Sequence, residues 1–297
     1  MHQPMPIIVG APRSGTTLLR LMLDAHPDLA IPPETGFLRE FASLDACASK
    51  DAFLSFLVSN PHDAPVWPDF GLGIDDMRRE LLQLEPFYSE GGLRAFYRLY
   101  AARYGKSRWG DKTPGHVFAM REIEARLPEA HFIHIIRDGR DVAQSWRKTW
   151  FSPGQDIATL ARHWQRWVEA GRLGTSSCRN AIELRFESLV ADPAAQLRRI
   201  CDFLELRFEP AMLHYFKNAP SRLSEHGARQ RADGSILVSR EQRMAQQKST
   251  LEPPMISRIG AWRRELTQTE QQIFEDVAGT LLRELGYSVR QPAAHAS

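Results

Sequence analysis

The sequence predicts an α/β protein in which helices flank a parallel β-sheet. Three observations lead to this prediction. An apolar run at residues 5–10 leads through a glycine-rich turn into a helical pattern at 16–24. A β-rich apolar run at 131–136 lies between two helical patterns, which is typical of a buried parallel strand. Residues 181–185 repeat this arrangement, and strands that alternate with helices favour a sheet covered on both faces.

The other elements follow in chain order. Residues 29–31 are a short strand candidate that two prolines end. From 36 to 104 the apolar residues recur at helical spacing, so we expect a helical insertion that forms a lid over the site. The core resumes at 108–112. Further helical patterns cover residues 115–127, 157–173, 188–206, 208–216 and 268–285, and another begins near 140.

The length of 297 residues suits one large α/β domain or two small ones. We expect a single domain over residues 1–290 that contains the insertion, followed by a frayed tail at 291–297. Residues 218–252, the polar segment, hold few large apolar side chains, so we expect a mobile loop there. A hydrophobic fraction of 43% is that of a globular protein, and a net charge of +2 gives no sign of nucleic-acid binding.

Cysteine usage and the apolar runs indicate a compartment. The 3 cysteines are far apart and lack C-x-x-C spacing, which fits a reduced compartment better than a disulfide framework or a zinc site. Histidines also lack metal-ligand spacing, so we expect no metal. The first strand begins near residue 6, which leaves no room for a signal peptide, and no apolar stretch approaches the roughly 18 residues of a membrane span. We therefore expect a cytoplasmic protein.

Residues 10–17, the phosphate loop, match the glycine spacing and final hydroxyl of the Walker A pattern G-x-x-x-x-G-K-[ST]. Thr16 stands where that pattern requires lysine. Backbone N–H groups and the positive end of the following helix still favour an anion. Without the lysine that reaches the β- and γ-phosphates, the loop is a poor cradle for ATP. It suits a single 5′-phosphoryl group that bears a sulfuryl group.

A second anion site is expected after the strand at 131–136. Arg137 ends that strand, where open α/β sheets bind ligands, and Ser145 follows on the adjoining helix. The two donors suit a second, separate phosphate. Two alternatives stay open, because Arg137 also fits an ion pair with Asp138 or Asp141, and Ser145 fits a structural hydroxyl.

These two segments, about 120 residues apart, together resemble the sulfotransferases that use 3′-phosphoadenosine 5′-phosphosulfate (PAPS). The resemblance implies that Arg137 and Ser145 hold the 3′-phosphate of the donor. It implies a 5′-phosphosulfate site made of Arg13, Ser14, Gly15, Thr16 and Thr17.

Residues 13–28, followed by Glu34 and Thr35, are similar to the tyrosylprotein sulfotransferases and their bacterial relatives. In that branch the glutamate aligned with Glu34 is the catalytic base, a role that needs a carboxylate within reach of the acceptor hydroxyl. The alternative is that Glu34 caps the helix that follows it.

Lys112, within the sequence WGDKTP, resembles the family lysine that steadies the bridging or leaving oxygen, and we expect Arg13 to assist it. The alternative for Lys112 is an ion pair with Asp111. Relatives that act on small alcohols use a histidine two residues beyond this lysine. That place is Pro114 here, and His116 comes two residues later, so a role for His116 stays open.

Two matches are weaker. Phe186 stands where the family has a tyrosine beside the nucleotide, and Arg258 begins a segment similar to the family's late Arg/Gly/Trp element that closes on the 3′-phosphate. Four tryptophans at helical spacing are expected to pack in the core, with a place at the acceptor pocket as the alternative. They are Trp146, Trp150, Trp164 and Trp167.

The sequence thus predicts a PAPS-dependent sulfotransferase that transfers a sulfuryl group to an acceptor hydroxyl, with Glu34 as base and Lys112 and Arg13 as charge stabilisers. The acceptor class stays open among small molecules, lipids, glycans and peptide tyrosines. Two alternatives remain: a P-loop nucleotide kinase or NTPase with a lysine-less loop, which would need Mg²⁺, and a nucleotide sensor without catalysis.

Overall fold

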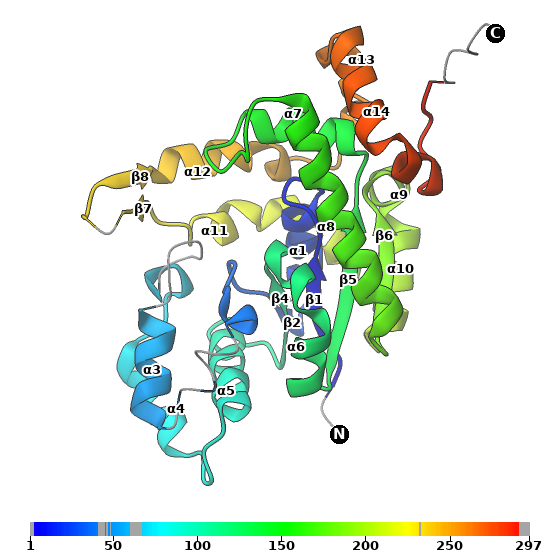
Figure 1. Ribbon diagram of the computed structural model, residues 1–297. Helices are drawn as coiled ribbons and strands as arrows, with labels where there is room; N and C mark the ends of the chain where they lie inside the picture. Colours follow the sequence, from blue (N-terminus) through cyan, green and yellow to red (C-terminus); the bar gives the residue numbers. More distant parts are fainter. Residues whose placement is uncertain are drawn as a thin grey trace, which may run out of the picture.

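A four-stranded parallel sheet forms the centre of the molecule (Figure 1). The computed structural model describes residues 3–40, 45, 47, 49–59, 67–231 and 233–290. The strand order is β4-β1-β5-β6, with bounds Asp111–Lys112, Met5–Val9, Ala130–Ile136 and Ala181–Arg185. In register, Ile8 of β1 lies opposite Lys112 on one side and Ile133 on the other. The predicted α/β fold with a parallel sheet is confirmed.

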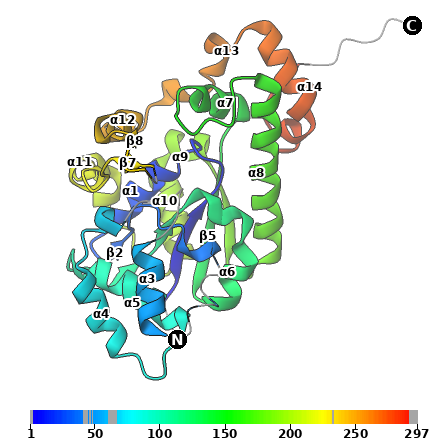
Figure 2. The same cartoon turned by 60° about the vertical axis from the view of Figure 1, so that its left-hand side comes forward.

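Helices cover both faces of this sheet. Successive residues of β1 show why, because Ile7 and Val9 belong to one buried cluster while Ile8 belongs to another. The face of Ile8 packs against α1 (Thr16–Asp24), α9 (Phe186–Ala191), α10 (Pro193–Phe203) and the 3₁₀ turns of η4 (Pro210–Lys217). Figure 2 shows α8 (Ile157–Ser177) running along the other side, next to α7 (Gly139–Arg147) and α14 (Gln268–Glu284).

The helical insertion packs beside the sheet and shares its core. It holds η1 (Phe37–Arg39), α3 (Lys50–Val58), η2 (Trp67–Phe70), α4 (Ile74–Leu82) and α5 (Ser89–Ala102). Aromatic rings join these helices, since the ring centroid of Phe96 lies 5.1 Å from that of Phe37 and 5.0 Å from that of Phe70. The helices expected between 36 and 104 are therefore present in the described residues, and their role as a lid stays a prediction.

The polar segment 218–252 has regular structure. It contains α11 (Ala219–Leu223), a hairpin of β7 (Arg229–Gln230) with β8 (Ile236–Val238), α12 (Arg240–Gln246) and η5 (Lys248–Leu251). Charged side chains hold it in place together with a few apolar ones: the Nε atom of Arg222 donates to Asp24 Oδ2 at 2.6 Å, and Leu223 is buried in the same cluster as Ile8. Low apolar content therefore did not reveal these elements, and mobility of the segment stays a prediction.

Three helix predictions needed correction. The pattern at 208–216 forms the 3₁₀ turns of η4, with non-helical φ and ψ at His214. The pattern at 188–206 is split into α9 and α10, because Asp192 accepts from the Ala195 N–H and Pro193 begins the second helix. The pattern at 115–127 opens as a 3₁₀ helix, η3 (Pro114–Phe118), before α6 (Met120–Arg126).

The short strands β2 (Leu29–Ala30) and β3 (Arg108–Trp109) pair with each other outside the main sheet. The elements η6 (Ile256–Arg258) and α13 (Trp262–Glu265) lead to α14. The expected tail at 291–297 lies outside the described residues. In the part of the chain that is described, no helix has the length and apolarity to cross a membrane.

Candidate active site

The carboxyl ends of the four central strands meet at one edge of the sheet. The phosphate loop follows β1, Lys112 ends β4, Arg137 follows β5, and Phe186 follows β6. Because all four strands run parallel, each of these residues leaves the sheet on the same side. The register alone places Lys112 beside Ile8, two residues before the loop begins.

Two glycines let the phosphate loop pass close to its neighbours. A Cβ on Gly10 would lie 2.4 Å from the Ile135 carbonyl oxygen, and one on Gly15 would lie 2.5 Å from Cδ2 of Phe186. Both have positive φ, 138° and 100°. Gly15 is also the N-cap of α1 and brings no capping side chain. The first N–H groups of α1 therefore keep their capacity to bind an anion.

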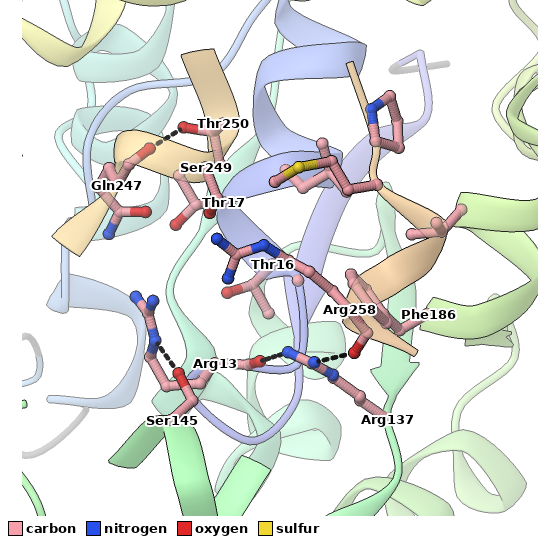
Figure 3. Close-up of a pocket in the computed structure, with 15 residues that line it drawn as sticks. Arg13, Thr16, Thr17, Arg137, Ser145, Phe186, Gln247, Ser249, Thr250 and Arg258 are labelled. Atoms are coloured by element: carbon pink, nitrogen blue, oxygen red, sulfur yellow. Dashed lines mark hydrogen bonds between the residues drawn. The ribbon is translucent and has the colours of Figure 1, made fainter. Parts of the chain in front are cut away.

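A cleft opens over this loop (Figure 3). Among the predicted donor-site residues it is lined by Arg13, Gly15, Thr16, Thr17, Arg137, Ser145, Phe186 and Arg258. Ser14 does not line it, since its side chain is buried and its N–H donates to the Ala11 carbonyl. Sequence reasoning missed Gln247, Ser249 and Thr250 on the opposite wall, because nothing in their spacing sets them apart.

Three guanidinium groups, those of Arg13, Arg137 and Arg258, line the cleft. The Nε atom of Arg13 donates to Ser145 Oγ at 2.9 Å, and its Nη2 donates to the Gln246 carbonyl at 3.1 Å. Burial, followed by the charges of Arg137 and Arg258, lowers the pKa of Arg13. A cluster of like positive charges of this kind attracts an anion.

Arg137 keeps one donor for a ligand. Its Nη2 donates to the Arg258 carbonyl at 2.8 Å and its guanidinium carbon lies 4.4 Å from the ring centroid of Phe186. An ion pair with Asp141 at 3.5 Å shows that the alternative drawn from the sequence is partly realised, whereas Asp138 pairs with Arg140. Among the described residues, the Nε atom of Arg137 is buried without a hydrogen-bond partner. Such a group points to a ligand or a water.

Glu34 and Lys112 form a tight ion pair. Lys112 Nζ donates to Glu34 Oε1 at 2.5 Å; the lysine side chain is 4% exposed and the glutamate 33%. Burial raises the pKa of Glu34, but the charge of Lys112 and then those of Arg229 and Arg243 outweigh it and hold this pKa below its usual value. The helix-cap alternative for Glu34 finds no support in the described contacts, since Gly36 caps η1 without a side chain. The charge of Asp111 also acts on Lys112, so the alternative drawn for Lys112 is partly realised.

Arg229 and Arg243 are further charges at this pair that the sequence did not single out. Both belong to the polar segment, where many basic residues without a repeat hid them. Nη1 of Arg243 donates to Asp69 Oδ2 at 3.1 Å, which joins α12 to the helical insertion. His116 is fully buried with Nε2 3.3 Å from Asp111 Oδ1.

The sequence profile of the sulfotransferase family matches residues 4–210. This chain belongs to the sulfotransferase family. Membership classes it as an enzyme and implies PAPS as its sulfuryl donor. Within the described residues, no group of three or more His, Cys, Asp or Glu side chains gathers as a metal site would require.

Relatives support the branch that the motifs indicated. This sulfotransferase is 28% identical over 69% of its length to a putative protein-tyrosine sulfotransferase of Caenorhabditis briggsae, covering 67% of that protein. It is 26% identical over 96% of its length to the nodulation protein NoeE of Sinorhizobium fredii, also covering 67%. It spans about half or less of some other relatives it matches, 52% and 42% of their lengths.

A sulfotransferase domain from the curacin biosynthetic pathway has the same fold. The TM-score is 0.59 at 18% identity, over 97% of this chain and 99% of that one. The predicted family and fold are confirmed.

The tryptophans of this sulfotransferase divide between core and surface. Trp146 and Trp164 are buried, as expected, and Nε1 of Trp164 donates to the Arg137 carbonyl at 3.1 Å. Trp167 packs edge-to-face against Phe118 with ring centroids 4.7 Å apart. Trp150 is 40% exposed and lines a wider cleft that adjoins the first at Arg13.

Proposed function

We propose that this sulfotransferase moves the sulfuryl group of PAPS to an acceptor hydroxyl by in-line displacement, with Glu34 as the general base. The Glu34–Lys112 pair at the edge of the sheet that carries the phosphate loop is the observation that supports this most. The acceptor proton passes to the Glu34 carboxylate as the acceptor oxygen bonds to sulfur. The bond from sulfur to the 5′-phosphate oxygen breaks, and 3′-phosphoadenosine 5′-phosphate leaves.

Lys112 and Arg13 are proposed to stabilise the charge that develops on the leaving oxygen. Lys112 is nearly buried, so its ammonium acts in a medium where charge interactions are strong. During turnover it would exchange Glu34 for the donor's bridging oxygen, which frees the carboxylate to accept a proton.

The proposed donor site runs across the cleft of Figure 3. The start of α1 and the hydroxyls of Thr16 and Thr17 hold the 5′-phosphosulfate, and Arg137, Ser145 and Arg258 hold the 3′-phosphate. The Nε atom of Arg137, which has no hydrogen-bond partner within the described ranges, supports its role. Phe186 packs against Gly15 and presents a ring beside the nucleotide.

The acceptor is proposed to be a hydroxyl on a small molecule, lipid, glycan or peptide. Peptide tyrosine is the first candidate to test, because the nematode relative bears the name protein-tyrosine sulfotransferase. A cytoplasmic location also stays a prediction.

Transfer of ³⁵S from labelled PAPS to a panel of tyrosine peptides, phenols, sugars and lipid alcohols tests the proposal directly. We expect a labelled product without added metal, and a loss of about 10²–10⁴-fold in kcat for Glu34→Gln, the usual size of a general-base contribution. Unchanged turnover in Glu34→Gln would remove Glu34 from the mechanism. Activity only with ATP and Mg²⁺ would favour the kinase alternative, and donor binding without transfer to any acceptor would favour the sensor.

A further inference from the structure

Glu34 and Lys112 lie in segments that differ in how firmly the backbone is held. Lys112 belongs to β4, which pairs with β1 in the central sheet. Glu34 lies in a stretch without helix or strand between β2 and η1. A residue outside regular structure has no ladder or helical hydrogen bonds to place it. Other contacts must therefore keep Glu34 Oε1 at 2.5 Å from Lys112 Nζ.

Thr35 supplies those contacts by bonding to both neighbours of Lys112. The Thr35 hydroxyl donates to Asp111 Oδ2 at 2.7 Å, and the Thr35 N–H donates to Thr113 Oγ1 at 3.0 Å. The residue after Glu34 is thus bonded to the residue before Lys112 and to the residue after it. Thr35, Asp111 and Thr113 are all buried, so water does not compete for these bonds.

Asp111 is itself bonded to a second element. Its Oδ2 also accepts from the Tyr97 hydroxyl of α5 at 2.8 Å, and its Oδ1 faces His116 Nε2 at 3.3 Å. Burial raises the pKa of Asp111, but the charge of His116 and the hydrogen bonds that the Asp111 carboxylate accepts outweigh burial. They hold its pKa below the usual value and keep the carboxylate ionised. An ionised acceptor makes shorter and stronger hydrogen bonds than a neutral one.

We propose that Thr35, Asp111 and Thr113 are positioning residues that hold Glu34 in register with Lys112. The proposal rests on the proposed function of Glu34 as general base. Reacting groups act only when they are held within a fraction of an ångström of the productive geometry. The edge strand β4 thus serves as the template that places a base which no helix or strand contains.

Isosteric variants of the two threonines test this without burying a new charge. Thr35→Val removes the bond to Asp111 and keeps the shape, whereas Thr35→Ser retains the hydroxyl. Thr113→Val removes the acceptor for the Thr35 N–H. We expect kcat to fall about 10- to 100-fold in both valine variants, since displacement of a reacting group by about 1 Å costs that much. The KM for PAPS stays unchanged and Thr35→Ser restores most of kcat.

A matched control is Thr175→Val in α8. The hydroxyl of this half-buried threonine donates to the Gly171 carbonyl at 2.8 Å, far along the chain from the site. Thr175→Val loses one threonine hydroxyl hydrogen bond, as Thr35→Val does. Because this bond does not connect to Glu34 or Lys112, the kcat of Thr175→Val should equal that of the unmodified enzyme. If Thr35→Val fails to fold, Thr113→Val decides the question.

The titration of Glu34, followed by carboxyl ¹³C NMR and assigned with Glu34→Gln, separates this proposal from the proposed function. The groups whose charges act on Glu34 are Lys112, Arg229 and Arg243. We expect its pKa to rise in both threonine-to-valine variants as the pair loosens. An unchanged Glu34 pKa together with an unchanged kcat would overturn the positioning role. A raised Glu34 pKa in the two valine variants, together with full kcat in those variants and in Glu34→Gln, would support positioning and overturn the role of Glu34 as base.

Discussion

At the scale of single residues, opposing effects of burial and charge set the protonation of Glu34 and Lys112. Burial raises the pKa of Glu34, yet the cations around it reverse the effect. Burial lowers the pKa of Lys112, and the attraction of Glu34 reverses this only in part. The glutamate is therefore ionised over most of the pH range, as a base must be before it accepts a proton.

These two shifts predict a bell-shaped pH profile for kcat/KM. Glu34 has a lowered pKa, so activity is lost as pH falls through a value below 4.5, its ordinary pKa. Lys112 also has a lowered pKa, so activity is lost as pH rises through a value below 10.5. Initial rates across the pH range measure both limbs, which belong to the coupled pair. An acid limb near pH 6 would contradict the ionised pair.

Replacement of Arg137 by methionine tests recognition of the 3′-phosphate. We expect affinity for 3′-phosphoadenosine 5′-phosphate to fall by about 1.5–3 kcal/mol, the range for a hydrogen bond to a charged group, while affinity for 5′-AMP changes little. Calorimetry with both nucleotides measures the difference. Arg147→Met is the control. Arg147 ends α7, the helix that begins just after Arg137; its Nη1 donates to Glu270 Oε1 at 2.6 Å, and it does not line the cleft. Equal losses for both nucleotides would remove Arg137 from the 3′-phosphate.

At the scale of elements, the junction of β1 and α1 makes the anion site, and its geometry depends on Gly15. Its φ of 100° is strained for any side chain, and Phe186 fills the space where a Cβ would stand. The loop, the helix and the residue after β6 are thus packed as one unit.

Gly15→Ala should therefore reduce donor binding as well as stability. Strain at positive φ costs about 1–3 kcal/mol, and the contact with Phe186 moves the loop away from the first N–H groups of α1. Gly234→Ala is the control, since Gly234 has φ of 82° but no atom of the described residues lies within 4 Å of its Cβ position. Calorimetric nucleotide titration and urea unfolding of both variants measure the two effects. Tight nucleotide binding by Gly15→Ala would show that the loop tolerates a side chain.

At the scale of the whole molecule, buried ion pairs join segments far apart in the chain. Arg222 of α11 makes two bonds to Asp24 at the end of α1, at 2.6 and 2.8 Å. Glu225, also buried, accepts from Tyr100 of α5 at 3.0 Å and pairs with Arg20 at 3.3 Å. The insertion, the sheet layer and the polar segment that carries Arg229 and Arg243 therefore meet in one network.

Arg222→Met should destabilise the fold by about 3–5 kcal/mol, because removing one partner leaves buried carboxylates unpaired. Arg172→Met is the control, since its exposed pair with Glu284 is worth only about 0–1 kcal/mol. Urea unfolding measures both. Arg222 lowers the pKa of Asp24, so the stability from this pair is present near neutral pH and is lost as pH falls through the folded pKa. A destabilisation equal to that of Arg172→Met would show that the network contributes little.

Ligand binding by the whole molecule is checked by thermal shift. At about 100 times its Kd, 3′-phosphoadenosine 5′-phosphate should stabilise the fold by roughly 2.7 kcal/mol without metal. AMP and ATP with Mg²⁺ serve as comparisons. Stabilisation by ATP with Mg²⁺ alone would contradict the donor site proposed here.

By itself, the sequence determined the parallel sheet and the phosphate loop, and it predicted Arg137 at a strand end and Glu34 and Lys112 as separate site residues; that Glu34 and Lys112 pair with each other came from the structure. The sequence predictions rest on local signals: continuous apolar runs in buried strands, fixed glycine spacing, and motifs of adjacent residues that resemble a known family. Only the tertiary structure decided that Arg229 and Arg243 act on Glu34, that Gln247 and Ser249 close the cleft, and that Thr35 bonds to both neighbours of Lys112. Such contacts join residues tens to hundreds of positions apart, and side-chain pairing across that separation leaves no period or spacing in the chain.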